Sequence, residues 1–412
     1  MAAGPMNAWP SSLHLSAAPL DSGSDIAARR LRQALRSAGA RADWLSPDQC
    51  SQGDGPDYAA APLFWTRSPG VSRLLGRAVD RLDRRRIGIH LSLTPGLRSA
   101  PLRRWPVDLL HLHWLGTGFL SLFSLRRLGK PLVWTLHDLW PLQGVLPYPP
   151  LEASPPHRWG MNLDPLALFL KRRCLPPEVQ FVAPSAWAAQ VARESAVYAA
   201  LPRPRPIVVI PNAVDPLFFT APARSQLPRD PARPLLLFGG SNAFSDPRKG
   251  WGLLEPLLPW LAQAYPQWRF ASFGELPPTG LVFPQPWQHH GFISDPHHLA
   301  ALYRSADLLL MPSQQETFGQ VAAEAQACGL PVVALADSGV GSVLEHQRSG
   351  FLMASSRSEA LQAALVYCLD QPRWLAAAAT EAATQARRRF DPALVADQHL
   401  HLYRQLLAGR GL

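Results

Sequence analysis

Two glutamates near the start of a C-terminal helical pattern are the strongest candidates for chemistry. Glu316 follows the apolar run 307–313, and Glu324 stands eight residues further along, beyond Gly319. Gly319 opens a predicted helix, and the first amides of a helix attract phosphate or hydroxyl oxygens. Carboxylates accept hydrogen bonds from neighbouring sugar hydroxyls. The spacing indicates a site for a polyhydroxylated or phosphorylated ligand, although either glutamate alone is compatible with an ordinary solvated side chain.

The segment PLLLFGGSNAFSDPRKGWGLL holds a second candidate. Gly239 and Gly240 end an apolar run and allow close approach to the backbone. Lys249 then stands where a helix is predicted to begin, a position that disfavours a cation unless an anion binds there too. The other 39 basic residues include only two lysines, Lys130 and Lys171. Lys249 is therefore a candidate for binding an anion, with a chance loop cation as the alternative.

Two weaker candidates lie in the first half of the chain. Gly23 and Ser24 connect a predicted strand to a predicted helix, an arrangement that cradles anions in many proteins. His137 and Asp138 end the run VWTLHD, and His113 ends LLHLHW. A histidine at the carboxyl end of a strand is placed to bond a substrate oxygen or to stabilise charge. A structural histidine with satisfied hydrogen bonds is the alternative for each.

The elements that must position these residues follow an alternating pattern of short apolar runs and helical periodicity. Such alternation is typical of βαβ units and parallel sheets. The fold class predicted is α/β, with two Rossmann-like, doubly wound parallel-sheet domains that bind ligands at the carboxyl ends of their strands. Strands are expected at 11–17, 42–46, 107–114, 131–138, 179–185, 206–212, 234–240, 268–274, 307–313 and 331–336. Helices are expected at 24–38, within 69–87, and at 118–128, 186–195, 250–264, 295–306, 319–328 and 356–370, followed by terminal helical segments.

Domain boundaries are expected where the pattern breaks. Residues 1–213 are expected to form an N-terminal domain, residues 214–390 a second domain, and residues 391–412 a C-terminal helix. The proline-rich stretch 141–165 is predicted to be a long loop, and 213–234 an interdomain linker. A hinge near residue 213 would let the cleft between the domains close on a ligand.

Composition narrows the classes of function. Residues 1–210 carry 25 Lys/Arg and 14 Asp/Glu, a net charge of +11, whereas residues 211–412 have a net charge of −1. A basic half favours an anionic partner, such as a phosphorylated acceptor or an anionic membrane surface, with a merely solvated surface as the alternative. The four cysteines form no C-x-x-C pair, so a disulfide framework is not expected. The absence of a secretory signal or an apolar span predicts a cytoplasmic protein, peripheral at most at the inner face of a membrane.

Several motifs are missing, and one extended resemblance remains. The chain has no Asp-x-Asp pair, complete G-x-G-x-x-G, P-loop or H-E-x-x-H. Residues 235–353 closely resemble the nucleotide-sugar-binding domain of family 4 glycosyltransferases, through FGGSNAFSDPRKGWGLL and the Glu-x7-Glu pair in ETFGQVAAE. The N-terminal half matches the same family more loosely, through SGSDIAARRLRQALRSAG, HLHWLG, WTLHDLWPLQG and IPNAVD. The resemblance implies the GT-B fold, in which residues 1–213 would be the acceptor-side domain and the helix at 391–412 would cross back to it. The matching branch acts in polysaccharide and cell-surface glycan assembly.

The resemblance also implies an activity. Such enzymes transfer a sugar from a nucleotide-diphospho-sugar to a glycan, lipid-linked or other acceptor, with retention of anomeric configuration and without a metal or other cofactor. Lys249 would neutralise the diphosphate, which explains how the reaction proceeds without Asp-x-Asp. Glu316 would hold the hydroxyls of the donor sugar, and His137 would lie over that sugar near the reacting centre. These three residues are the catalytic candidates.

Donor binding would involve a wider set of residues, again by resemblance. Glu324 would hold the ribose hydroxyls, and the strand-end segment 291–293 would touch the base. The backbone of 318–320 would support Glu316, and the loop at Gly23 would lie near the phosphates or the acceptor. The full set expected to bind the donor is Gly23, Ser24, Gly240, Lys249, Ile293, Glu316, Phe318, Gly319, Gln320 and Glu324.

Three departures from the family pattern keep a second function open. Ser24 replaces a glycine of the N-terminal loop, Asp25 follows it, and Ala243 occupies the position of a frequent arginine. They would suit a catalytically silent GT-B protein that binds nucleotide sugars or partner glycosyltransferases. Binding of nucleic acid is not expected, because the basic half lacks interleaved aromatic residues or a reading motif.

Overall fold

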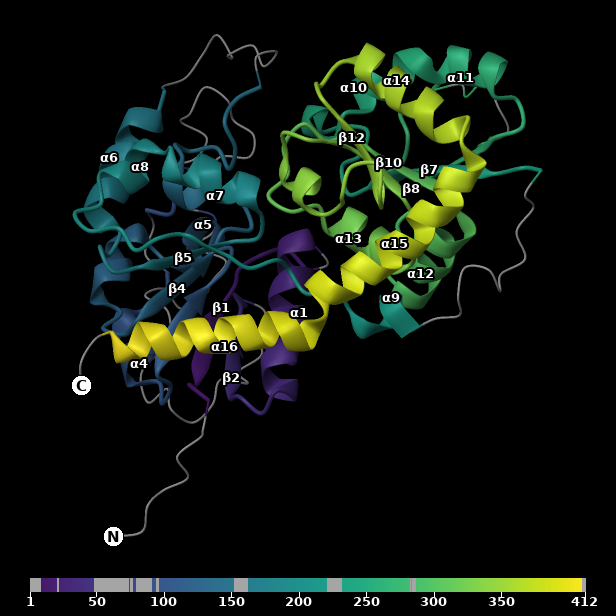
Figure 1. Ribbon diagram of the computed structural model, residues 1–412. Coiled ribbons are helices and arrows are strands. Elements are labelled where there is room, and N and C mark those ends of the chain that lie inside the picture. Colours follow the sequence, from purple (N-terminus) through teal and green to yellow (C-terminus); the bar gives the residue numbers. More distant parts are fainter. Residues whose placement is uncertain are drawn as a thin grey trace. The chain divides into compact units, whose positions relative to one another are not determined.

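The computed structural model describes residues 9–20, 22–47, 74, 77–78, 91–93, 96–151, 162–220, 232–281, 283 and 287–409. The chain divides into two compact units (Figure 1). Unit 1 comprises Met1–Ile210 and Val395–Leu412, and unit 2 comprises Pro211–Leu394. Each unit is built on one parallel sheet of six strands, which confirms the expected α/β class.

The sheet of unit 1 has the order β2-β1-β3-β4-β5-β6. The chain adds β2 on one side of β1 and then crosses to the other side for β3, so the strand order reverses between β1 and β3. Its strands are β1 (Ser12–Leu15), β2 (Ala42–Leu45), β3 (Leu109–Leu112), β4 (Leu132–Thr135), β5 (Gln180–Ala183) and β6 (Val208–Val209). Its helical elements are α1 (Gly23–Ser37), α4 (Ser99–Arg104), α5 (Gly116–Phe119), η1 (Leu122–Arg127), η2 (Trp140–Leu142), α6 (Asp164–Cys174), α7 (Ala186–Arg193) and α8 (Ala196–Ala199), with most of α16 (Pro392–Ala408) added from the end of the chain.

The two faces of the unit 1 sheet differ in chemistry. Alternate residues of a strand point to opposite faces. Leu13, Leu15, Leu110, Leu112 and Trp134 belong to the apolar core. The intervening positions of the same three strands hold the apolar Leu109 and Val133 together with buried polar side chains: Ser12 and His14 in β1, His111 in β3, and Thr135 in β4. From the end of the chain, α16 joins unit 1 and places Tyr403 within 2.6 Å of Nδ1 of His111.

Unit 2 also has a six-stranded parallel sheet, with a different strand order and an apolar centre. Its sheet runs β12-β11-β10-β7-β8-β9, so the order reverses between β7 and β10. Its strands are β7 (Leu235–Gly240), β8 (Arg269–Gly274), β9 (Trp287–His289), β10 (Leu308–Met311), β11 (Val332–Leu335) and β12 (Gly350–Met353). Its helical elements are α9 (Pro216–Thr220), η4 (Pro247–Lys249), α10 (Trp251–Leu254), η5 (Glu255–Leu257), α11 (Leu258–Ala264), α12 (Pro296–Ser305), α13 (Gln320–Ala327), η6 (Gly339–Ser342), α14 (Ser358–Leu369) and α15 (Pro372–Phe390).

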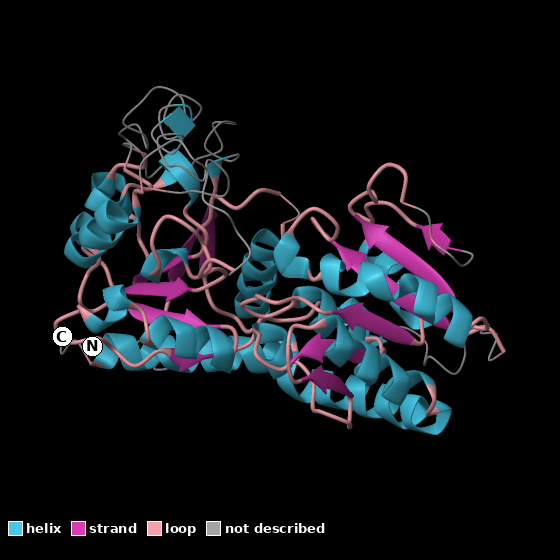
Figure 2. Ribbon diagram, turned by 90° about the horizontal axis from the view of Figure 1, so that it is seen from above, coloured by secondary structure: helices cyan, strands magenta, loops and turns pink. Residues whose placement is uncertain are grey.

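Both faces of the unit 2 sheet are covered by helices (Figure 2). Leu235 and Leu237 of β7 pack with α12 and α13 in one apolar cluster. Leu236 and Phe238 of the same strand pack with α10, α11 and α14 in the other. Burial on both faces explains why these strands read as continuous apolar runs in the sequence.

Several expected elements are confirmed in type but are shorter, and some expectations were wrong. The helix expected at 118–128 is instead the short α5 followed by η1, because Leu120 adopts extended backbone between them. The helix expected at 250–264 is divided into α10, η5 and α11, with Pro256 and Pro259 at the starts of the later pieces. The expected linker 213–234 contains α9, and α6 begins inside the expected loop 141–165.

Other elements were not anticipated. The strands β9 and β12 were missed, since the first is short and polar and the second begins with a glycine. Most of the helix expected within 69–87 and Cys50 lie outside the described residues. The remaining cysteines, Cys174, Cys328 and Cys368, are buried free thiols. Among the described helices, none combines the length and the hydropathy needed to cross a membrane.

Candidate functional site

The strongest candidates gather at the reversal of strand order in unit 2. In open parallel sheets the carboxyl ends of the strands on either side of such a reversal leave a crevice for ligands. Gly239 and Gly240 end β7, and Glu316 lies in the loop that follows β10. A Cβ at position 239 would come within 2.3 Å of the carbonyl oxygen of Phe273, so only glycine lets β7 and β8 meet here. Gly240 has a φ of +137°, which also favours glycine.

The loop after β7 is held by two carboxylates. Glu275 accepts hydrogen bonds from the amides of Phe244 and Ser245, at 2.8 and 2.9 Å. Burial opposes its ionisation, yet the hydrogen bonds from Ser245 and Phe244 leave the pKa of Glu275 below its ordinary value. Asp246 caps η4 through the amide of Arg248 and pairs with the guanidinium of the same residue at 2.5 Å. The loop is therefore fixed before any ligand binds.

Lys249 and Glu316 form an ion pair across the two loops. Nζ of Lys249 lies 2.5 Å from Oε1 of Glu316, with 28% and 14% of the side chains exposed. The amide of Gln314 donates to the carbonyl oxygen of Arg248 at 2.7 Å, which joins the loop backbones. Gly250 permits this contact because a Cβ there would lie 2.2 Å from the carbonyl oxygen of Pro312. The expectation that Lys249 begins a helix was wrong: it ends η4, and the left-handed Gly250 separates it from α10.

The start of α13 supplies backbone donors beside this pair. Gly319 is its N-cap with a φ of +92°, and a Cβ there would come within 2.7 Å of Val340. No side chain caps the helix, so the amides of its first turn are placed to bind an anion. Gln320 and Glu324 are one turn apart and share a face. Glu324 is buried and accepts a long hydrogen bond from the hydroxyl of Tyr303, at 3.4 Å.

The remaining residues predicted for unit 2 have mixed positions. The side chain of Phe318 is buried in the core and packs edge-on against Phe390, so only its backbone is available to a ligand. Ile293 packs against the same core, while the neighbouring Phe292 is 62% exposed. Ala243 is buried among apolar side chains, where an arginine would not fit without rearrangement.

In unit 1, the predicted loop at Gly23 and Ser24 forms the first turn of α1. Ser22 is the N-cap and accepts from the amide of Asp25 at 3.3 Å. The carboxylate of Asp25 is buried and receives two hydrogen bonds from Nε of Arg29, at 2.9 and 2.8 Å. The negative charge at position 25 is thereby balanced within α1. A Cβ at Gly23 would meet nothing within 4 Å, so this turn is open to a neighbour.

His137 lies just beyond the end of β4 and is half-buried. Its Nε2 lies 2.9 Å from Nδ1 of His113. Burial lowers the pKa of His137 to about 4 and that of His113 well below its ordinary value, so both are neutral at physiological pH. A neutral imidazole can bond a substrate oxygen, but it does not supply a positive charge there.

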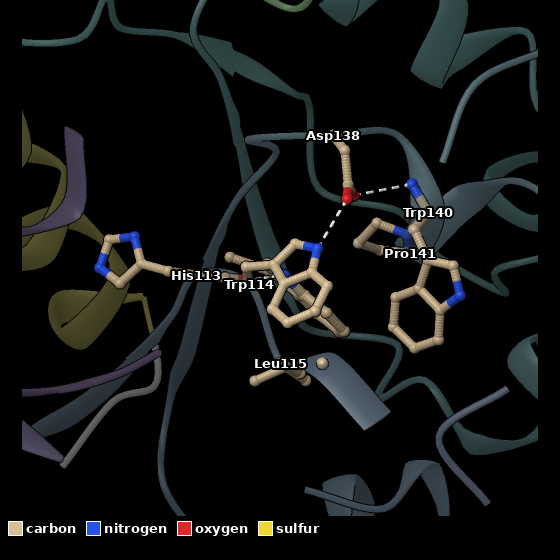
Figure 3. A pocket seen from close by; sticks show the side chains of 8 residues that line it. His113, Trp114, Leu115, Asp138, Trp140 and Pro141 are labelled. Atoms are coloured by element: carbon tan, nitrogen blue, oxygen red, sulfur yellow. Dashed lines mark hydrogen bonds between the residues drawn. The ribbon is translucent and has the colours of Figure 1, made fainter. Parts of the chain in front are cut away.

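Asp138 faces a small hollow next to these histidines (Figure 3). Its carboxylate accepts from the indole of Trp114 at 3.0 Å and from the amide of Trp140 at 3.0 Å. Figure 3 shows the ring of His113 pointing away from the indole of Trp114, as expected for consecutive residues of extended backbone. Asp138 therefore orders the loop after β4.

Two features of unit 1 were missed in the sequence. Ser12 and His14 join the predicted His113 and His137 in one hydrogen-bonded network, and His111 stacks on it. The signal was the alternation in SLHL, LLHLH and WTLH. Lys171 is fully buried and donates to the carbonyl oxygens of Trp140, Gln143 and Gly144. The rarity of lysine in this sequence could have indicated that Lys171 has a specific structural role.

The arrangement in unit 2 can bind a phosphorylated, hydroxyl-rich ligand. Lys249 supplies a compact positive charge, and uncapped amides of α13 lie one loop away. A carboxylate offers about four lone-pair positions, so Glu316 can accept further hydrogen bonds besides that from Lys249. The glycines at 240 and 319 keep the backbone accessible to such a ligand.

Comparison with known proteins agrees with this chemistry. The family model described as Glycosyltransferase Family 4 matches residues 22–217, and that of glycosyl transferases group 1 matches residues 286–388. A curated relative, D-inositol 3-phosphate glycosyltransferase of Segniliparus rotundus, is 31% identical over 373 residues, which cover 85% of this chain and 79% of the relative.

Solved structures show the same architecture. Sucrose-phosphate synthase from Thermosynechococcus elongatus aligns with a TM-score of 0.65 at 22% identity, over 97% of this chain and 100% of the other. Alr3699/HepE of Anabaena in complex with UDP-glucose aligns with a TM-score of 0.58 at 19% identity, over 96% and 100% of the two chains. At this level of identity the likeness concerns the fold, which is GT-B as the sequence predicted.

Proposed function

The chain belongs to glycosyltransferase family 4, and from that membership we propose that it transfers a sugar from a nucleotide-diphospho-sugar with retention of anomeric configuration and without a metal. The acceptor is a glycan, a lipid-linked molecule or another phosphorylated molecule. The observation that carries the proposal is the Lys249–Glu316 pair at the strand-order reversal of unit 2. It joins a cation for the diphosphate to a carboxylate for the sugar.

Lys249 and the first turn of α13 support departure of the nucleotide. When the bond between sugar and diphosphate breaks, negative charge develops on the leaving phosphate oxygens. Groups that are already oriented toward this charge lower the barrier most effectively. The ammonium of Lys249 is held by Glu316, and its loop by Asp246 and Glu275. This pre-orientation takes the place of a metal ion in the proposal.

The two glutamates divide recognition of the hydroxyls. Glu316 is 14% exposed at its side chain and lies beside the ammonium, so it would bind hydroxyls of the donor sugar next to the diphosphate. Glu324 is deeper, one turn into α13 and beside Tyr303, and would bind the ribose hydroxyls. In this proposal Ile293 and its neighbours contact the base, and His137 contacts the donor sugar.

The charge of the first half supports an anionic acceptor. Residues 1–210 carry a net charge of +11, and the name of the Segniliparus relative includes an inositol 3-phosphate acceptor. A phosphorylated or lipid-linked acceptor would be attracted to such a surface. Peripheral association with anionic lipids is part of the same proposal.

The test is a turnover assay with purified protein, a panel of nucleotide sugars and phosphorylated acceptors. UDP-sugars come first, because Alr3699/HepE was solved with UDP-glucose. Glu316→Gln keeps the size of the side chain and removes its charge, so we expect turnover to fall by about 10²–10³, the usual loss for a key electrostatic contact. Glu345→Gln is the matched control, since Glu345 forms an exposed pair with Arg348 and should leave turnover unchanged.

Three results would contradict the proposal. Turnover that disappears with EDTA and returns with a divalent ion would refute independence from metal. Full turnover in Glu316→Gln would remove the proposed role of the pair. A wild-type protein that binds nucleotide sugars without turning over any of them would support the catalytically silent alternative, which the departures at Ser24 and Ala243 had suggested.

A further inference from the structure

The side chains of α6, which lies at the periphery of unit 1 (Figure 1), are arranged with reversed polarity. Ala167, Lys171 and Cys174 form its inner face and are buried. Leu166 and Phe169 are 43% and 54% exposed. A surface helix ordinarily buries its large apolar residues and exposes its lysines. The outer face of α6 therefore indicates contact with a partner.

Lys171 fixes α6 in this orientation. Its Nζ donates to the carbonyl oxygens of Trp140, Gln143 and Gly144. A rotation of the helix that buried Phe169 would withdraw Lys171 from all three carbonyls and leave them without this donor. Buried acceptors that lose their donor are costly, so the apolar side chains stay on the outside.

The neighbouring η1 adds a second exposed phenylalanine. Phe123 is 51% exposed, and η1 packs against α6. Residues three apart in a 3₁₀-helix lie one above the other, so Phe123 and Arg126 share one side of η1. The guanidinium of Arg126 donates to the carbonyl oxygen of Leu175, at the C-terminal end of α6, over 3.2 Å. Phe123 therefore lies on the side of η1 that adjoins α6.

Pairs of arginines border these apolar side chains. Each of α4, η1 and α6 has two consecutive arginines in its last turn, and all six are exposed: Arg103, Arg104, Arg126, Arg127, Arg172 and Arg173. Short connections lead from these elements to β3, β4 and β5, which are neighbours in the sheet. The pairs therefore gather at the amino ends of adjacent strands and form one positive border.

The charge of this border is not balanced locally. Among the described residues, no ion pair joins any of the six arginines to a carboxylate. The one acidic residue in the sequences of the three elements is Asp164, at the other end of α6, where it accepts from the amide of Val145. Arginines also suit the C-terminal ends of helices, but that preference does not explain the exposed apolar side chains beside them.

We propose that the outer face of α6 and η1, with its arginine border, docks the protein on an anionic lipid membrane. Phe123, Leu166 and Phe169 enter the boundary between headgroups and acyl chains, and the arginines bind lipid phosphates. A soluble polyanion would use the arginines but not the leucine. The inference assigns a surface to the membrane association in the proposed function, and its purpose rests on that function.

The first test is co-sedimentation of the whole protein with lipid vesicles. We expect vesicles of phosphatidylcholine with about one-third phosphatidylglycerol to bind it at least tenfold more tightly than vesicles of phosphatidylcholine alone. Salt at about 0.5 M should remove most of this difference, because it screens the arginines. Absence of binding to the anionic vesicles, or equal binding to both kinds, would overturn the proposal.

A paired removal of charge tests the border. Arg172→Gln with Arg173→Gln should weaken binding to anionic vesicles by about tenfold, since each basic residue near the surface contributes to attraction. Arg373→Gln with Arg388→Gln is the matched control, because both are exposed arginines of α15 in unit 2 and the same charge is lost. Equal losses in the two double variants would mean that total charge, and not this border, binds the membrane.

One substitution on the apolar face tests insertion. Phe169→Ser should weaken binding to anionic vesicles by about tenfold, because the ring no longer leaves water. Val366→Ser, at a 39% exposed position of α14, should leave binding unchanged. Unchanged binding in Phe169→Ser would overturn insertion. A wild type that sediments as a dimer, and becomes a monomer in Phe169→Ser, would assign this surface to a second copy of the chain instead.

Turnover with a water-soluble acceptor separates this inference from the proposed function. The Phe169 variant and the Arg172 and Arg173 double variant should retain wild-type turnover, since they change only exposed side chains outside the candidate site. Vesicle binding without any turnover in the wild type would refute the proposed function while supporting the docking surface. Turnover in a wild type that does not bind anionic vesicles would do the reverse.

Discussion

The two units each use a parallel sheet of six strands with a reversal of strand order, and they build two different centres at that reversal. In unit 2, the reversal between β7 and β10 is lined by glycines and crossed by the Lys249–Glu316 ion pair. In unit 1, the reversal between β1 and β3 is filled by buried neutral histidines. The centre of unit 2 combines accessible backbone with charged side chains. The centre of unit 1 consists of closely packed, hydrogen-bonded histidines that are neutral.

The contrast shows how a fold separates two tasks. Binding a diphosphate requires charge and accessible amides, and these are stable only where solvent or a ligand can reach them. Keeping a cluster of histidines neutral requires burial, because desolvation disfavours the charged imidazolium. The following substitutions and one titration are designed to change each centre separately.

The largest effect is expected at the charged centre. Lys249→Met should lower turnover by about 10²–10³, because it removes the charge that we propose to face the leaving phosphate. Arg248→Met is the matched control, since its guanidinium already pairs with Asp246 rather than with Glu316. Donor turnover in the two variants decides the point. If both lose activity equally, general positive charge in the loop, and not the position of Lys249, is what matters.

The next effect concerns the stability of unit 1. Lys171→Met removes a buried ammonium that bonds three backbone carbonyls, at Trp140, Gln143 and Gly144. Leaving buried acceptors without a donor should lower the free energy of unfolding by about 3 kcal/mol. Lys130→Met is the control, because the part-buried Nζ of Lys130 has one recorded carbonyl partner, Val107. Urea denaturation measures both variants, and equal losses would show that the three carbonyls find other donors.

The third prediction is the response of the histidine centre to acid. Burial lowers the pKa of His14 to about 3 and that of His137 and His399 to about 4. In the unfolded chain these residues take up protons near pH 6.5, so below that pH the unfolded state binds more protons. The free energy of unfolding should therefore fall as pH falls from about 6.5 toward 4, by roughly 1.4 kcal/mol per pH unit for each histidine.

Denaturation at several pH values between 7.5 and 5 measures this slope. His14→Gln should reduce the slope by the share of one histidine, whereas His298→Gln, an exposed position in α12, should not. The neutral histidines therefore predict that the protein is most stable near neutral pH and loses free energy of unfolding in mild acid. A slope that His14→Gln leaves unchanged would mean that His14 is already protonated or exposed in the folded protein.

The fold could largely be predicted from the sequence because its strands are buried on both faces. Continuous apolar runs such as 234–240 and 307–313 mark central strands without ambiguity. The sequence was weakest where backbone conformation departs from the periodicity. Extended backbone at Leu120 and the prolines at 256 and 259 interrupt helices whose apolar spacing remains helical.

The candidate site was predictable to a similar degree. Lys249 and Glu316 were recognised as separate candidates, 67 residues apart, and their direct contact depends on the packing of two loops. That packing relies on Gly250 facing Pro312, which no local pattern encodes. In the sequence, the network of His14, His113 and His137 was visible only as an alternation of apolar and polar residues. Its hydrogen bonds join residues that are 99 and 24 positions apart, which no local pattern reveals.

The late addition of α16 to unit 1 has a consequence for synthesis on the ribosome. Tyr403, the partner of His111, is made 292 residues after it. At roughly 5–20 residues per second, that interval lasts about 15–60 seconds. During this time the histidine-lined face of the nascent unit is without the helix that closes it, while all of unit 2 is being made. The nascent polypeptide thus passes through a stage in which all strands of the unit 1 sheet have been made but α16 has not.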